Sequence, residues 1–101
     1  MELNITNNQE LHRFEFIKNG IEAVLEYKQS RNRIYLIHTG VPKEFSGRGI
    51  AAALATTALN YARENDLEAV IICPYVKAYV KRHPELLEGL KHSFYPPPEN
   101  K

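Results

Sequence analysis

Residues 33–65 read RIYLIHTGVPKEFSGRGIAAALATTALNYAREN. The spacing of the apolar side chains changes near the middle of this stretch. Its first part is rich in β-branched, aromatic and aliphatic side chains and stops at Gly40 and Pro42, which predicts a strand over residues 33–41. From residue 49 the apolar side chains recur every three or four positions, which predicts an amphipathic helix over residues 49–65. We therefore expect a strand that leads through a glycine-containing turn into an alanine-rich helix that can lie close to a sheet.

The segment after this helix predicts a second strand and more helix. Residues 69–73 form a continuous apolar run, which is typical of a strand buried on both faces and parallel to the strand over residues 33–41. A helix is expected after Pro74, because proline is favoured at a first helical position. Pro84 can start another short helix, and Pro96–Pro98 predicts an extended tail.

The segment before residue 33 predicts an antiparallel hairpin. Apolar side chains alternate over residues 11–17, and Asn19-Gly20 is a common two-residue hairpin turn, so we expect a hairpin over about residues 11–28. The predicted order is β-β-β-α-β-α. The fold class is therefore α+β (α/β), with a mixed sheet, an antiparallel front half, a βαβ crossover at the back and helices packed on the sheet.

The composition is that of an ordinary globular protein. The chain has 101 residues, 44% of them hydrophobic and 25% charged, so we expect a single domain over residues 1–101. The formal net charge of +1 gives no general attraction to nucleic acid or to an anionic membrane, and neither is expected as a partner. No apolar run approaches the roughly 20 residues that a membrane helix needs.

The cysteine and histidine residues give expectations about the cellular compartment and about metal binding. Cys73 is the one cysteine, so no internal disulfide can form, and we expect a reducing, cytoplasmic environment. The N-terminal residues have neither a basic nor an apolar segment, so no secretory signal is expected. The histidines at positions 12, 83 and 92 have no carboxylate or cysteine partner at metal-ligand spacing, so no metal site is predicted.

The segment Gly47-Arg48-Gly49-Ile50-Ala51 lies between the predicted strand and helix. Two glycines at such a junction let the backbone turn its N–H groups outward, and the helix dipole adds partial positive charge, so a phosphate or pyrophosphate would be bound well. The same glycines could instead serve only to make a tight turn. The Walker loop and the dinucleotide fingerprint both require other glycine spacings.

Three blocks of this sequence resemble the GNAT-type acyl-CoA N-acyltransferases, and most closely their minimal members of about 100 residues. The first two blocks are His38-Thr39-Gly40-Val41-Pro42 and Gly47 to Ala51. The third is Cys73-Pro74-Tyr75-Val76 with Tyr79 and Arg82-His83-Pro84-Glu85. The GNAT signature is Arg or Gln, two residues, Gly, one residue, then Gly or Ala; Gly49 and Ala51 match it, whereas Ser46 replaces the long polar residue. The resemblance covers about residues 10–90 and implies a GNAT-like fold.

The resemblance implies acetyl-CoA as the cofactor, in a cleft where the two parallel strands splay apart. The thioester would lie near Cys73. The implied function is acetyl-CoA-dependent N-acetyl transfer to an amine, peptide or protein acceptor by a monomer or weak dimer; the alternative is a non-catalytic coenzyme A-binding module. The implied cofactor residues are Thr39, Gly40 and Val41 for the pantetheine arm, and Gly47, Arg48, Gly49, Ile50 and Ala51 for the pyrophosphate.

Cys73 and His38 are the candidate catalytic residues. Cys73 precedes Pro74 at a predicted helix N-terminus, which favours a thiolate that could accept an acyl group, although a lone cysteine after an apolar strand can equally be a small buried hydrophobe. His38 could take a proton from an amine or from Cys73, or could simply be a hydrogen-bonded strand residue. Tyr75 and Tyr79 are four residues apart on one predicted helix face and could be core aromatics with their hydroxyls at the rim. The resemblance also implies a tyrosine that protonates the departing thiolate, and either residue could serve.

Overall fold

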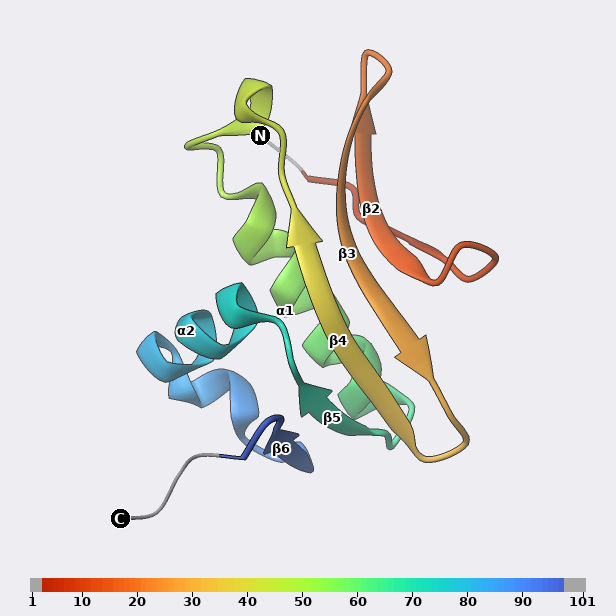
Figure 1. Cartoon of the computed structure of the whole chain (residues 1–101), viewed down its shortest axis with the longest axis vertical. Coiled ribbons are helices and arrows are strands. Elements are labelled where there is room, and N and C mark those ends of the chain that lie inside the picture. Colours follow the sequence, from red (N-terminus) through yellow and green to blue (C-terminus); the bar gives the residue numbers. More distant parts are fainter. Residues whose placement is uncertain (1–2, 98–101) are drawn as a thin grey trace.

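Six strands form one mixed sheet, and two helices pack on it, as the computed structural model of residues 3–97 shows (Figure 1). The strands follow one another across the sheet in sequence order. The first three pairings are antiparallel, and β4, β5 and β6 are parallel. The elements are β1 (Thr6–Asn8), β2 (Arg13–Lys18), β3 (Ile21–Gln29), β4 (Arg33–Gly40), the 3-10 helix η1 (Lys43–Phe45), α1 (Ile50–Glu64), β5 (Glu68–Ile71), α2 (Pro74–Arg82), the 3-10 helix η2 (Pro84–Leu87) and β6 (His92–Phe94).

The long elements confirm the predicted α+β class and its βαβ crossover. Asn19 and Gly20 both have positive φ, as a tight hairpin turn between β2 and β3 requires. The predicted order β-β-β-α-β-α is incomplete, because β1 pairs with β2 at one edge of the sheet and β6 pairs with β5 at the other. Of the predicted tail, Pro98 lies outside the described residues.

Both helices cover the same face of the sheet. Because β4, β5 and β6 step across the sheet in one direction, two right-handed crossovers place α1 and α2 on one side. Figure 1 shows α1 behind β4, and α1 contacts β2 to β5, α2 and η2. The main core side chains lie on this face: Phe14, Leu25, Tyr27, Ile34, Leu36, Leu54, Leu59, Ala69, Ile71, Val76 and Val80.

The opposite face, here called the outer face, carries no helix among residues 3–97. Its β3 residues are exposed or half-buried, as Glu22, Val24 and Glu26 show. The prediction that the strand after α1 is buried on both faces is therefore wrong. Ala69 and Ile71 are buried beneath the helices, whereas Val70, which points to the outer face, is only half-buried.

An irregularity in β4 separates its second half from β5. Glu26 pairs with His38 but Tyr27 pairs with Leu36, so Ile37 is an extra residue that has no partner in β3. Such a β-bulge bends the strand that carries it. The parallel pairing with β5 ends at Leu36, whose carbonyl accepts the N–H groups of both Ile72 and Cys73 at 2.9 Å. Among residues 3–97, residues 37–40 therefore have no strand partner on the β5 side, and this break in the parallel pairing is here called the split.

Candidate functional site

A hollow of about 310 Å³ lies beside the split, between the end of β4 and the start of α1. We call it the loop hollow. It collects residues from β4's end, the turn after η1, the first turn of α1 and the first turn of α2. Its lining residues are Val41, Phe45, Ser46, Gly47, Gly49, Ile50, Ala51, Ala52 and Tyr75.

The start of α1 provides the features that a pyrophosphate needs. Gly47 and Gly49 have φ of +77° and +75°, which side chains rarely adopt, and a Cβ built at either would meet no described atom within 4 Å. Gly49 is the N-cap, and no side chain in the described chain caps this helix; its first turn also lacks acidic residues. The first N–H groups of α1 are therefore available to a bound anion, and the helix dipole favours negative charge there.

Cys73 lies at the split and is held by a threonine from the other strand. Its side chain is buried, and it is the N-cap of α2. The sulfur lies 3.2 Å from Oγ1 of Thr39, in a hydrogen bond in which either atom could be the donor. The structure thus brings together Thr39 and Cys73, which are 34 residues apart in the sequence.

His38 lies on the other face of the sheet and does not meet Cys73. It pairs with the exposed Glu26, whereas the neighbouring Thr39 pairs with the fully buried Leu25. Directly paired residues point to the same face, so the His38 imidazole points to the outer face and the Thr39 side chain to the helix side. The expected proton transfer between His38 and Cys73 has no geometric support; His38 can instead reach an acceptor that approaches from the outer face.

Tyr75 joins the loop hollow to α2. Its side chain is half-buried, and burial raises the pKa of its hydroxyl, with Tyr79 adding to the effect. The hydroxyl therefore stays protonated at neutral pH, as a proton donor to a departing thiolate must. Tyr79 does not line the loop hollow.

Five of the eight predicted cofactor residues line the loop hollow: Val41, Gly47, Gly49, Ile50 and Ala51. Thr39 and Gly40 lie on the diverging half of β4, and Arg48 is exposed on the loop between the two glycines. Sequence reasoning did not assign Phe45, Ser46 or Ala52 to the site. Phe45 gave no signal, because it is anchored by a contact with Phe16 that only the tertiary structure creates.

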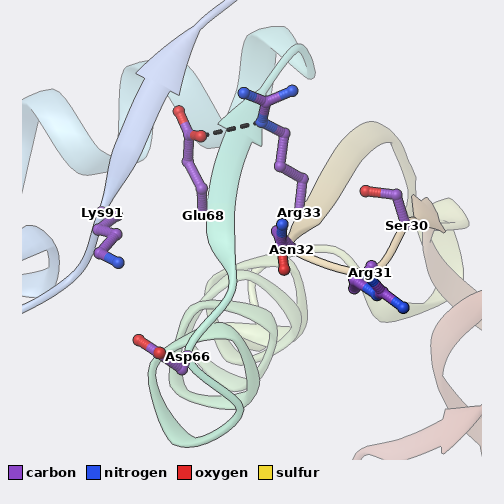
Figure 2. A pocket seen from close by; sticks show the side chains of 7 residues that line it. All are labelled: Ser30, Arg31, Asn32, Arg33, Asp66, Glu68 and Lys91. Carbon is purple, nitrogen blue, oxygen red and sulfur yellow. Dashed lines mark hydrogen bonds and ion pairs between the residues drawn. The ribbon is translucent and has the colours of Figure 1, made fainter.

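A larger hollow of about 440 Å³ lies at the opposite end of the sheet, between the β3–β4 turn and the amino ends of β4 and β5. Arg33 and Glu68, which both line it, form an ion pair of 3.0 Å. Figure 2 shows this pair near the top of the view, with Lys91 and Asp66 on the left. Ligands of parallel sheets bind at the carboxyl ends of the strands. The loop hollow and the split, at the carboxyl ends of β4 and β5, therefore form the candidate site despite the smaller volume.

Residues 3–97 contain neither a membrane-spanning helix nor a cluster of metal ligands. No helix there is long and apolar enough to span a bilayer. Nor do three or more His, Cys, Asp or Glu side chains from this part of the chain gather as metal ligands.

Known proteins with similar sequences show the family of this chain. The family model described as GCN5-related N-acetyl-transferase matches residues 13–90. Protein NATD1 of Mus musculus is 39% identical over 94 residues, which cover 88% of this chain and 86% of the mouse protein. Protein NATD1 of Gallus gallus is 39% identical over 93 residues, which cover 89% of this chain and 84% of the chicken protein. The chain belongs to the GCN5-related N-acetyltransferase family, as its sequence blocks predicted.

Proposed function

We propose that this protein is an acetyl-CoA-dependent N-acetyltransferase that holds its cofactor in the loop hollow and the split. One observation carries the proposal. Within residues 3–97, no side chain caps the N-terminus of α1, which opens into the loop hollow, and the adjoining residues 37–40 of β4 have no strand partner on the β5 side. Family membership gives the chemistry, and the geometry supports the cofactor that this chemistry needs.

The residues of the split suit an extended, amide-containing ligand. In an ordinary sheet the N–H and C=O groups of residues 37–40 on the β5 side would pair with a neighbouring strand. Pantetheine carries amide groups that can take the place of that strand, so Thr39 and Gly40 would hold it. Val41 and the amides of residues 47–51 would hold the pyrophosphate.

His38 and Tyr75 would each take part in one proton transfer, His38 on the outer face of the sheet and Tyr75 on the side of the loop hollow. When bound, acetyl-CoA supplies the acetyl group as a thioester: an amine nitrogen bonds to the carbonyl carbon, the C–S bond breaks, and the sulfur takes up a proton. His38 would accept the proton that the amine loses, because its imidazole is exposed on the outer face. Tyr75 would donate a proton on the side of the loop hollow.

Cys73 would line the thioester, and a direct attack by the amine fits the surroundings of this side chain best. Among the hydrogen bonds of residues 3–97, its side chain makes one, to Thr39, which is not a base. A covalent acetyl group on Cys73 is the competing route, and the experiment below detects it.

A non-catalytic coenzyme A-binding module is the second candidate function. It is favoured by the outer face, where no helix from the described part of the chain walls an acceptor site around His38. Binding without turnover would distinguish this module from the enzyme.

The test is mass spectrometry of the purified protein with acetyl-CoA and a panel of amines, scoring free coenzyme A, acetylated amine and acetylated protein. Cys73→Ala tests the covalent route, and Gly49→Asp places a carboxylate in the loop hollow. Gly20→Asp is the matched control, because Gly20 has φ of +77° and lies in the hairpin turn. Turnover by wild type and Gly20→Asp but not by Gly49→Asp supports the proposal, whereas absence of coenzyme A binding by the wild type would overturn it.

A further inference from the structure

Three aromatic side chains form a ladder along one face of α2. Tyr75, Tyr79 and His83 are spaced four residues apart, so they lie one above another on the helix. The rings of Tyr75 and Tyr79 are stacked, with centroids 5.8 Å apart and planes 15° apart. The rings of Tyr79 and His83 have centroids 4.7 Å apart and planes 46° apart. All three residues are half-buried, so each keeps part of its surface open to a ligand.

The ladder starts at the cofactor site and leads away from it. Tyr75 is part of the loop hollow, next to the first turn of α1, whereas Tyr79 and His83 lie successively further from the hollow along α2. Arg82, seven residues after Tyr75, shares this face, is exposed, and adds a positive charge near the ladder.

The other cations of α2 belong to a different surface. Lys77 and Lys81 line a separate hollow of about 240 Å³ together with Phe94 and Pro96. That hollow lies toward β6, and Tyr75 takes no part in it. A ligand that leaves the loop hollow past Tyr75 therefore meets the ladder and Arg82.

We propose that the ladder is the platform for the adenine base of coenzyme A, with Tyr79 as its central ring and Arg82 beside the phosphate on the ribose. This inference rests on the proposed function, since it needs the pyrophosphate at the start of α1. The adenosine part is attached directly beyond the pyrophosphate, and a purine offers a flat π-face that stacks on tyrosine rings. With this platform, the protein would bind coenzyme A more tightly than shorter pantetheine carriers, which lack the adenine base.

The test compares coenzyme A with 4′-phosphopantetheine, which lacks the adenosine part, by calorimetry on the full chain. Tyr79→Leu should weaken coenzyme A binding about fivefold to a hundredfold and leave 4′-phosphopantetheine binding unchanged. Tyr79→Phe keeps the ring and should bind coenzyme A like the wild type. Tyr35→Leu, on the outer face, is the matched control. The chain has 6 tyrosines and no tryptophan, so quenching of tyrosine emission by coenzyme A gives a second readout, which Tyr79→Leu should reduce.

The possible results distinguish a failure of the adenine platform from a failure of the proposed cofactor site. Equal losses for both ligands in Tyr79→Leu would show that Tyr79 only supports the fold of α2, and would overturn the platform. So would wild-type protein that binds the two ligands equally well. If the wild type binds neither ligand, the proposed cofactor site itself fails, and the platform with it.

Discussion

Alanine at Gly49 should weaken both folding and coenzyme A binding, whereas alanine at Gly20 should weaken folding alone. The two glycines have nearly the same backbone conformation, with φ of +75° and +77°, and a Cβ at either would lie in open space. The cost to folding is therefore conformational and the same at both positions, about 1–2 kcal/mol for a left-handed alanine. In a domain of this size each kcal/mol lowers the melting temperature by about 4–8 °C.

The two variants differ in what the added methyl group meets when ligand binds. At Gly49 it lies in the loop hollow against the position proposed for the pyrophosphate, which should cost about 1–3 kcal/mol of binding, or about 5- to 150-fold in Kd. Gly47→Ala should behave like Gly49→Ala. Gly89→Ala, at φ of +69° and also in open space, is a second control like Gly20→Ala.

Thermal or urea unfolding measures the loss of folding stability, and calorimetric titration with coenzyme A measures the loss of affinity. The reasoning about the helix N-terminus fails if all four variants bind coenzyme A as tightly as the wild type. The reasoning about backbone conformation fails if the four losses of stability differ by more than about 1 kcal/mol.

Two further predictions concern side-chain pairs. The hydroxyl of Tyr27, a residue that is 2% exposed, donates a hydrogen bond of 2.6 Å to Asn7. Asn7→Ala removes this acceptor and should lower the free energy of unfolding in urea by about 1–3 kcal/mol. A decrease no larger than that caused by Tyr27→Phe would contradict this prediction. Hydrogen bonds from Arg33 and then Ser93 hold the pKa of Glu68 below its usual value, so the stability this carboxylate contributes is full above about pH 4.3 and is lost as pH falls through its lower folded pKa. Arg33→Gln should therefore raise the pKa of Glu68 and shift that loss to higher pH; an unchanged carboxyl titration by NMR would refute this.

The long elements could be predicted because each is built from local patterns. Helical spacing in α1, alternation in β2 and the Asn19-Gly20 turn act within a few residues of one another and do not depend on the rest of the chain. β1 and β6 have three residues each, TNN and HSF, which are too short and too polar to show a period. They form strands because β2 and β5 offer unpaired edges, and this condition is visible only in the folded sheet.

The bulge in β4 explains why the site was only partly predictable. Strict alternation would place Leu36 and His38 on one face and Thr39 on the other. The extra residue Ile37 reverses this, so that Leu36 and Thr39 share the helix side and His38 faces outward. The glycine loop needed no such information, because two glycines directly before a helix define their own geometry.

The second half of β4 pairs with β3 but, among residues 3–97, has no strand partner on its β5 side, and this margin lies within the sheet and not at its rim. The outer edges, β1 and β6, are only three residues long, and short edge strands give other protein chains little to pair with. The longer unpaired margin, residues 37–40, faces Cys73 from inside the same sheet. Among residues 3–97, a strand-sized margin without a β-partner thus lies inside the sheet, while the exposed edges stay too short to invite pairing with another chain.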